Sequence, residues 1–469
     1  MNLLQACQDP NLFGPWFRDP ATWSAWFAFL RALFGLPLEG EDLEVYRRCT
    51  GRAEPPAEPA REAWLVCGRR AGKSFVLALL AVYIATFRDW RSHLALGERA
   101  TVMIIACDMR QARIVVRYLA ALLEIPLLRP LVLGKQTNRN APGYDLDGQV
   151  TIEVHTTSFR SVRGYTIVAA IFDEIAFWRS EESANPDSEI VAAVRPAMAT
   201  VPGAMMICAS SPYARRGVLW RAWRRHYGKD GPILVWQADT RTMNPTVPQA
   251  VIDEAYEDDQ LSAAAEYGAQ FRTDVESYVA REVVEALVES GCFERAPVPA
   301  LRYHGFVDPS GGSRDSMTLA IGHLEGEHRV LDCLRERRPP FSPEEVVIEF
   351  AQTLRAYDVA TVDGDRYAGE WPVEGFRKRG IEYRAAEKTK SELYRDLLPL
   401  LNSRRVELLD SSRLVAQLCG LERRTARGGR DSIDHAPGGH DDLCNAAAGV
   451  LVSADGGSAY AWKSYSMSA

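Results

Sequence analysis

A short run near residue 70 has the residue types of a phosphate-binding loop. It reads Cys67-Gly68-Arg69-Arg70-Ala71-Gly72-Lys73-Ser74 and lies between an apolar run over 63–67 and a helix predicted over 73–87. Backbone N–H groups and a helix N-terminus there would face phosphates, Lys73 would reach the outer phosphates, and the Ser74 hydroxyl would bind Mg²⁺. The first glycine of the usual loop would fall at Cys67, whereas it stands at Gly68. We still predict ATP binding by residues 68 to 74.

An acidic pair follows a second apolar run, and it supplies the other half of such a site. Ile167 to Phe172 is predicted as a buried strand, and Asp173 and Glu174 come directly after it. In nucleotide hydrolases one carboxylate holds the metal and another residue orients the attacking water. Asp173 is therefore predicted to bind Mg²⁺ and Glu174 to polarise water, which favours hydrolysis over transfer to a small substrate.

Two weaker signals flank this pair. Ser210 and Ser211 end a strand predicted over 204–209, where hydroxyls could sense the outer phosphate and transmit its loss. Arg160 and Arg163 precede Gly164; an arginine there would either stabilise the nucleotide of a neighbouring subunit or be an ordinary solvated turn residue.

The C-terminal part carries a second set of acids. Asp308 ends a predicted strand over 303–307, Asp363 and Asp365 end another over 359–363, and Asp441 and Asp442 begin an alanine-rich helix. Two divalent ions about 4 Å apart need several carboxylates from different elements, and such a pair cleaves phosphodiesters. We predict a site for Mg²⁺ or Mn²⁺ built from these acids. Spacing alone leaves Asp363 and Asp365 as alternatives, because residues two apart on a strand face the same way.

Basic residues lie close to these acids in sequence. Residues 423–430 contain four arginines, and Arg335, Arg337 and Arg338 form a second group. They would contact DNA phosphates or lie in a solvated loop.

Strand and helix patterns place both sets of residues on α/β frameworks. From residue 63 apolar strands alternate with helices, which predicts a mainly parallel sheet carrying a P-loop ATPase. After residue 300 three strands are joined by short turns before the alternation resumes, which predicts a mixed sheet of the RNase H-like type. The expected division is 1–240 for the ATPase domain, 241–299 for a helical connector, 300–455 for the nuclease domain and 456–469 for a tail.

Composition excludes several classes of protein. The 469 residues are 47% hydrophobic and 25% charged, as in soluble globular proteins. The net charge of -7 requires any DNA contact to be local, and nine scattered cysteines indicate a reducing compartment. No signal peptide or membrane segment is expected. The aromatic run over 12–38 is read as a helix packed on its own domain, with a platform for a partner or a nucleotide base as the alternative.

Together these motifs resemble the large terminase subunit of tailed bacteriophages over nearly the whole chain. The matching stretches are 67–74, Arg163-Gly164, 171–174, 364–369 and His440 to Leu443. The resemblance implies ATP-driven translocation of double-stranded DNA into a procapsid and metal-dependent cleavage of concatemeric DNA. It implies that Arg163 acts in trans within a homo-oligomeric ring, that Asp308, Asp365 and Asp441 serve the nuclease, and that the middle position is Asp365 rather than Asp363. The implied partners are the small terminase subunit and the portal protein, in the host cytoplasm.

Two other functions fit parts of the pattern. A helicase-like DNA repair ATPase fused to a nuclease would need further helicase motifs after Ser211, and none is recognisable. A nucleotide-switched DNA-binding adaptor with an inactive C-terminal domain would bind ATP without cleaving DNA.

Overall fold

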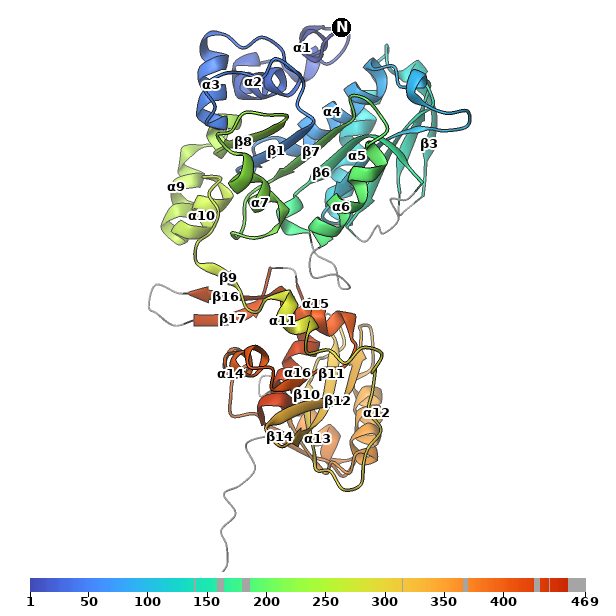
Figure 1. The fold of residues 1–469 in the computed structure, drawn as a ribbon, viewed down its shortest axis with the longest axis vertical. Coiled ribbons are helices and arrows are strands. Elements are labelled where there is room, and N and C mark those ends of the chain that lie inside the picture. Colours follow the sequence, from blue (N-terminus) through green and yellow to red (C-terminus); the bar gives the residue numbers. More distant parts are fainter. Residues whose placement is uncertain are drawn as a thin grey trace, which may run out of the picture. The chain divides into compact units, whose positions relative to one another are not determined.

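The computed structural model divides the chain into two compact units (Figure 1). It describes residues 1–138, 141–157, 164–178, 186–313, 315–365, 370–425, 431–437 and 439–453. Unit 1 runs from Met1 to Asp274, and unit 2 begins at Val275. Each unit has its own sheet and its own hydrophobic cores.

Unit 1 is built on an eight-stranded sheet in the order β3-β4-β5-β2-β6-β7-β1-β8. All pairings are parallel except those of the β3–β4–β5 edge. The strands are β1 (Glu62–Cys67), β2 (Ala100–Ala106), β3 (Val132–Gln136), β4 (Gly143–Leu146), β5 (Val150–Thr156), β6 (Thr166–Asp173), β7 (Met205–Ser210) and β8 (Ile233–Ala238). The predicted mainly parallel sheet is confirmed.

Helices cover both faces of this sheet, which explains the continuous apolar runs of its strands. One core joins α1 to α5 to one face, and another joins α6 and α7 to the other. The helices are α1 (Leu3–Gln8), α2 (Ser24–Leu33), α3 (Gly40–Thr50), α4 (Lys73–Phe87), α5 (Met109–Leu123), α6 (Pro186–Met198) and α7 (Gly217–His226). Within the aromatic run, Trp26 and Phe29 on α2 are buried in the core of unit 1, as the packing interpretation expects.

The segment expected as a connector, 241–299, is divided between the two units, because the boundary falls after Asp274. Unit 1 keeps α8 (Thr240–Met243), α9 (Gln249–Asp258) and α10 (Gln260–Glu266). Unit 2 takes β9 (Val275–Ser277) and α11 (Arg281–Glu285). The physical reason is that Asn244 and Glu266, in the first part of this segment, contact the loop after β1, so this part packs with unit 1.

Unit 2 contains a six-stranded mixed sheet in the order β14-β13-β10-β11-β12-β15. β10, β11 and β12 are antiparallel, whereas β13 pairs parallel with β10 and β14 parallel with β13. The strands are β10 (Tyr303–Asp308), β11 (Met317–Glu325), β12 (His328–Arg337), β13 (Thr361–Gly364), β14 (Glu382–Ala385) and β15 (Val406–Glu407). Three antiparallel strands followed by parallel additions beside the first confirm the predicted RNase H-like mixed sheet.

Helices again pack on both faces of the second sheet. One core contains α16 with α14 and α15, and the other contains α12 and α13. Their bounds are α12 (Pro343–Ala356), α13 (Trp371–Arg377), α14 (Lys390–Asn402), α15 (Ser412–Gly420) and α16 (Asp442–Ser453). Among the residues that the structure describes, no helix is long and apolar enough to cross a bilayer.

The arginine-rich segment after α15 includes a β-hairpin. β16 (Leu421–Thr425) pairs antiparallel with β17 (Asp431–His435), and β16 also pairs with β9 in a small separate sheet. Arg423 forms an ion pair with Asp431, and Arg424 pairs with Glu422. These two arginines therefore belong to the hairpin itself rather than to a solvated loop; residues 426–430 lie outside the described part of the chain.

Candidate functional site

Three side chains hold the loop after β1 by its carbonyl groups. Thr240 Oγ1 donates to the Arg69 carbonyl (2.7 Å), Asn244 Nδ2 to that of Arg70 (2.8 Å), and Trp26 Nε1 to that of Ala71 (2.8 Å). A planar trans peptide points its N–H away from its C=O. The N–H groups of residues 70 to 72 are therefore directed away from these donors, as an anion-binding loop requires.

Gly68 and Gly72 suit this loop for different reasons. A Cβ on Gly68 would lie 2.3 Å from Thr240 Oγ1 and 2.6 Å from the Tyr267 carbonyl, so only glycine allows this close approach. Gly72 has φ +93° directly before α4, a conformation that glycine adopts without strain. The displaced first glycine is thus explained by packing against α8 rather than by the usual spacing.

Lys73 lies at the centre of the predicted constellation and is only 5% exposed. Its Nζ donates to the carbonyls of Cys67 (3.2 Å) and Gly68 (3.1 Å) and to Ser211 Oγ (3.0 Å). It also forms an ion pair with Glu174 Oε1 at 3.3 Å. Burying an ammonium group costs free energy unless an anion neutralises it. Here the anion is the carboxylate of Glu174, at the end of another strand.

Ser74 and Asp173 meet as the sequence predicts. Ser74 Oγ donates to Asp173 Oδ2 at 2.9 Å. Gln111 on α5 joins them, because its Nε2 lies 2.9 Å from Ser74 Oγ and 2.8 Å from Asp173 Oδ2. Sequence reasoning missed Gln111; its place in the first turn of a helix that follows a neighbouring strand was the available signal.

The surroundings of Asp173 fit a divalent cation. Asp173 is fully buried, and its Oδ1 has no hydrogen-bond partner. Burial, reinforced by the charge of Glu174, raises the pKa of Asp173 to about 6. Carboxylate and hydroxyl oxygens are the donors that Mg²⁺ prefers. Ser74 and Asp173 are therefore the residues that would hold the metal, and a cation there would supply the missing partner for Oδ1.

Glu174 is held in an unusual backbone conformation, with φ 51°. Its Oε2 accepts hydrogen bonds from Ser210 Oγ (3.2 Å) and from the Ser211 N–H (3.1 Å). These contacts follow from the strand order, since β7 lies between β1 and β6. Left-handed conformations of residues other than glycine cost of order 1–3 kcal/mol and cluster at functional sites. Of the two predicted serines, Ser211 contacts both Lys73 and Glu174, and Ser210 contacts Glu174.

The acids of unit 2 also meet at one edge of a sheet. β10 and β13 are parallel with Phe306 opposite Asp363 and Val307 opposite Gly364, so Asp308 and Asp365 follow at adjacent strand ends. Asp441 and Asp442, at the start of α16, are 5% and 9% exposed. Asp442 Oδ2 accepts from the Ser316 N–H at 3.3 Å, and Asp441 Oδ2 accepts from Tyr394 OH at 2.9 Å.

The electrostatics indicate that four carboxylates share this edge. Burial raises the pKa of Asp308 well above its ordinary value, and the charges of Asp442, Asp365 and Asp441 add to the shift. Burial, with the charge of Asp441, raises the pKa of Asp442 to about 6. Asn445 Oδ1, one turn into α16, is buried without a hydrogen-bond partner. This all-oxygen donor set fits Mg²⁺ or Mn²⁺ and does not suit zinc.

Asp363 has different neighbours from Asp365. Burial raises the pKa of Asp363, interactions with Arg384 and His304 lower it, and the charge of Glu387 raises it. Asp363 lines a cavity of about 930 Å³ together with His304, Arg384 and Lys388. Asp365, in contrast, is among the charges that raise the pKa of Asp308. The structure therefore brings Asp365 to Asp308 and leaves Asp363 beside basic groups.

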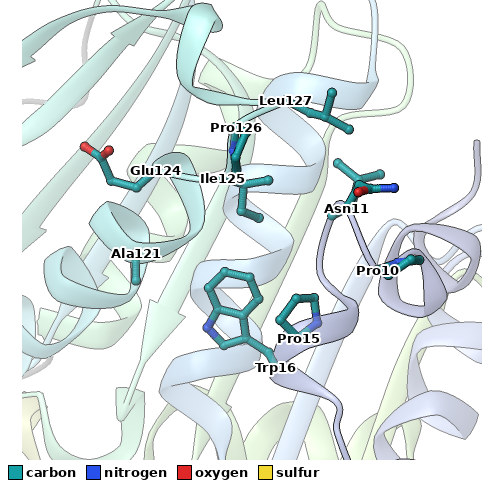
Figure 2. Close-up of a pocket in the computed structure, with 10 residues that line it drawn as sticks. Pro10, Asn11, Pro15, Trp16, Ala121, Glu124, Ile125, Pro126 and Leu127 are labelled. Atoms are coloured by element: carbon teal, nitrogen blue, oxygen red, sulfur yellow. The ribbon is translucent and has the colours of Figure 1, made fainter.

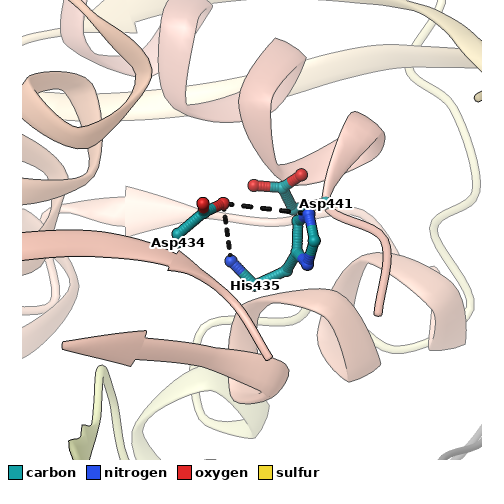
Figure 3. A group of neighbouring side chains, drawn as sticks. All are labelled: Asp434, His435 and Asp441. Carbon is teal, nitrogen blue, oxygen red and sulfur yellow. Dashed lines mark hydrogen bonds and ion pairs between the residues drawn. The ribbon is translucent and has the colours of Figure 1, made fainter. Parts of the chain in front are cut away.

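The β16–β17 hairpin contributes two possible metal ligands, an aspartate and a histidine, that the sequence does not single out. Asp434 and His435 on β17 lie with Asp441 so that one ligand atom of each is within 4.8 Å of the others (Figure 3). Lys390, the first residue of α14, forms ion pairs with Asp434 (2.8 Å) and Asp441 (3.0 Å). Because this segment was expected to be a loop, no strand register was available from which to predict that Asp434 and His435 lie beside Asp441.

Some predicted residues do not join either group. Arg160 and Arg163 lie outside the described residues. Arg335 and Arg337 are paired with Glu294 and Glu349, and Arg338 lies 3.6 Å from Glu336. Arg69 forms an ion pair with Glu266 at 2.9 Å, and Arg70 is exposed in the loop with φ 64°.

A further cavity of about 530 Å³ lies at the other end of α5 from Gln111 (Figure 2). Its lining includes Pro15, Trp16, Ile125 and Leu127. None of the residues predicted to carry chemistry lines it, so it is separate from both candidate sites.

No protein-family model and no curated protein matches the chain. Solved structures do. The HK97 bacteriophage large terminase is 15% identical, covering 84% of this chain and 91% of that chain, with a TM-score of 0.37. A large terminase from a thermophilic bacteriophage, solved in complex with ATP-γ-S, is 13% identical, covering 85% and 95%, with a TM-score of 0.35. The large terminase nuclease of the thermophilic phage G20c, solved with magnesium, is 19% identical, covering 34% and 84%, with a TM-score of 0.30.

Proposed function

We propose that this chain is a large terminase subunit, in which unit 1 hydrolyses ATP and unit 2 is a metal-dependent DNA endonuclease. The observation that carries the proposal is the presence in one chain of two separate phosphate-chemistry sites. One combines Lys73, Ser74, Asp173 and Glu174 on a parallel sheet. The other gathers acids on an RNase H-like sheet.

In unit 1 the residues divide the work of hydrolysis. The loop N–H groups and Lys73 bind the phosphates of ATP, and Ser74 and Asp173 hold Mg²⁺. Bound Mg²⁺ would neutralise charge on the phosphate oxygens. In the structure, Lys73 Nζ lies 3.3 Å from Glu174 Oε1. A phosphate group of ATP is also an anion, so it competes with Glu174 for the Lys73 ammonium. Glu174, once released from the ion pair with Lys73, orients the attacking water. Ser210 and Ser211 transmit this release of Glu174 to strand β7.

In unit 2 the acids at the sheet edge would hold two divalent ions. Asp308, Asp365, Asp441 and Asp442 are the proposed ligands, and Asp365 rather than Asp363 takes the middle position because it shares the electrostatic environment of Asp308. The ions would activate water and stabilise the leaving oxygen of a DNA phosphodiester.

The assembly and its partners follow from the terminase proposal. ATP hydrolysis by unit 1 would drive translocation of double-stranded DNA into a procapsid, and unit 2 would cleave concatemeric DNA. The small terminase subunit and the procapsid portal are the proposed protein partners, and the host cytoplasm is the proposed compartment. A ring of copies would let Arg163 act on a neighbouring nucleotide, since head-to-tail contacts place one subunit's residue at the next subunit's site.

Two assays on one purified protein test the proposal. ATP hydrolysis with Mg²⁺ and cleavage of plasmid DNA with Mg²⁺ or Mn²⁺ are both expected. Hydrolysis without cleavage under any divalent ion would favour a nucleotide-switched adaptor with an inactive second domain. Cleavage tied to ATP-driven strand separation would favour a helicase-like repair enzyme.

Glu174→Gln is expected to keep ATP binding and to lose turnover by about 10²-fold or more, because the amide keeps the size of the side chain but is a poor base for water. Binding is measured with a fluorescent ATP analogue and turnover by phosphate release. Wild-type turnover in this variant would refute the role of Glu174. Glu124→Gln is a control, since Glu124 pairs with Arg129 just after α5 and touches neither Lys73 nor Asp173 in the contacts described.

Gln111→Leu is expected to raise the Mg²⁺ concentration needed for half-maximal ATP hydrolysis by about tenfold. The reason is that Gln111 Nε2 bonds both proposed metal ligands and holds them together. A Mg²⁺ titration of ATP hydrolysis measures the effect. Gln136→Leu is the control, because Gln136 bonds only to Asp145 at the sheet edge among the contacts described. An unchanged titration for Gln111→Leu would show that the amide does not position the ligands.

A further inference from the structure

Lys390 makes an unusual pair of contacts beside the proposed nuclease metal site. Its Nζ lies 3.0 Å from Oδ2 of Asp441, a proposed ligand, and 2.8 Å from Oδ1 of Asp434 on the hairpin. The Asp441 side chain is 7% exposed, whereas those of Asp434 and Lys390 are partly exposed. A protein cation thus already neutralises a carboxylate that the proposed function assigns to a metal.

Neighbouring contacts fix Lys390 in this position. The helix α14 begins with a capping box in which Thr389 and Glu392 bond each other's backbone. Ser391 Oγ accepts the Ile433 N–H of β17 at 2.9 Å, so the start of α14 is tied to the hairpin. One turn later, Tyr394 OH donates to the same Asp441 Oδ2 at 2.9 Å. A single helix therefore supplies both donors to this oxygen.

We propose that Lys390 is a positioning residue that acts as an internal counter-ion, holding Asp441 in the metal-free nuclease site and competing with the divalent ion for that carboxylate. The inference rests on the proposed nuclease function. An ammonium and a divalent cation near one carboxylate repel each other, and this repulsion is strong at short range in a partly buried site. Lys390 therefore weakens metal binding while keeping the site ordered without metal.

A different role would have a different consequence. If Lys390 served only to attach the hairpin to α14, its loss would lower the stability of the protein and leave metal affinity unchanged or weaker. Counter-ion competition instead predicts that metal binds more tightly once the ammonium is removed. The sign of the change in metal affinity therefore separates the two roles.

The test is calorimetric titration of the full chain with Mn²⁺ in the absence of nucleotide. Every sample carries Asp173→Asn, which disables the proposed metal ligand of unit 1. Lys390→Met is expected to bind Mn²⁺ about tenfold more tightly than the parent, and its thermal midpoint without metal is expected to fall. Lys390→Arg, which keeps the charge, is expected to bind like the parent. Lys388→Met is the matched control, because Lys388 lies just before α14 and pairs with Asp396 of that helix at 2.7 Å.

Each outcome has a defined meaning. Tighter binding in Lys390→Met alone supports the proposal, and if that variant is too unstable to titrate, Lys390→Gln provides the same comparison. Unchanged or weaker Mn²⁺ binding in a folded Lys390→Met protein overturns it while leaving the nuclease proposal intact. If the parent binds no Mn²⁺, or if Asp308→Asn does not abolish the Mn²⁺ binding of the parent, the metal site itself is refuted. The proposed role of Lys390 then fails with it.

Discussion

Replacing Lys73 by alanine is expected to abolish ATP hydrolysis, with a loss of at least about 10²–10³-fold. The ammonium is buried, and in the structure its bonds to two loop carbonyls, Ser211 and Glu174 place it where the outer phosphates of ATP would lie. Its removal takes away a preorganised positive charge and leaves Glu174 without its partner. Nucleotide affinity is therefore expected to fall as well, which distinguishes this variant from Glu174→Gln.

Phosphate release and binding of a fluorescent ATP analogue measure the two effects of Lys73→Ala. Lys135→Ala is a suitable control, because Lys135 lies on the edge strand β3 and contacts the ring of Tyr144 rather than the loop. Both activities should survive in the control. If Lys73→Ala keeps more than a small fraction of wild-type turnover in a folded protein, the loop after β1 does not bind the transferred phosphate.

Asp308→Asn is expected to eliminate DNA cleavage. The asparagine keeps the volume of the side chain, but it removes one negative charge from a site that we propose holds two cations, and such sites tolerate loss of a ligand poorly. The matched variant is Asp363→Asn, on the neighbouring strand of the same sheet. Asp363 lies near His304, Arg384 and Glu387, and Asp365 rather than Asp363 is the proposed metal ligand, so we expect only a partial reduction.

Plasmid cleavage with Mg²⁺ and with Mn²⁺ measures both variants. Loss of cleavage in Asp363→Asn together with full cleavage in Asp365→Asn would reverse the assignment of the middle position. Undiminished cleavage by Asp308→Asn would remove the two-metal site at the end of β10.

Much of both frameworks could be predicted because buried parallel strands leave a strong signal. The helix predicted over 73–87 is α4, and the strands before Asp173 and Ser210 lie within one residue of their predicted ends. Residues at the carboxyl ends of parallel strands meet at one edge, so Lys73, Asp173 and Glu174 could be placed together from the sequence. The strand pattern likewise grouped Asp308 with the acids near residue 364, but it left Asp363 and Asp365 as alternatives, and only the resemblance to large terminase subunits favoured Asp365.

Other parts could not be predicted because they depend on contacts between distant segments. The segment 241–299 was predicted to be a connector, although its Asn244 and Glu266 contact the loop after β1. The hairpin of β16 and β17 has a charged, polar sequence with no apolar alternation, so its pairing and the placement of Asp434 near Asp441 were hidden. Gln111 and Lys390 belong to no recognisable sequence motif, and only their contacts in the folded structure indicate a role for them.

The most direct test of the central claim is a side-by-side measurement of ATP hydrolysis and plasmid cleavage for the wild-type chain, Lys73→Ala and Asp308→Asn. Two separate sites in one chain predict that the wild type performs both reactions. Lys73→Ala should lose ATP hydrolysis while its unit 2 still binds Mn²⁺, and Asp308→Asn should lose cleavage with nearly unchanged ATP hydrolysis. Loss of both reactions in Asp308→Asn while the protein stays folded, or a wild-type chain that performs neither reaction with any divalent ion, would contradict it.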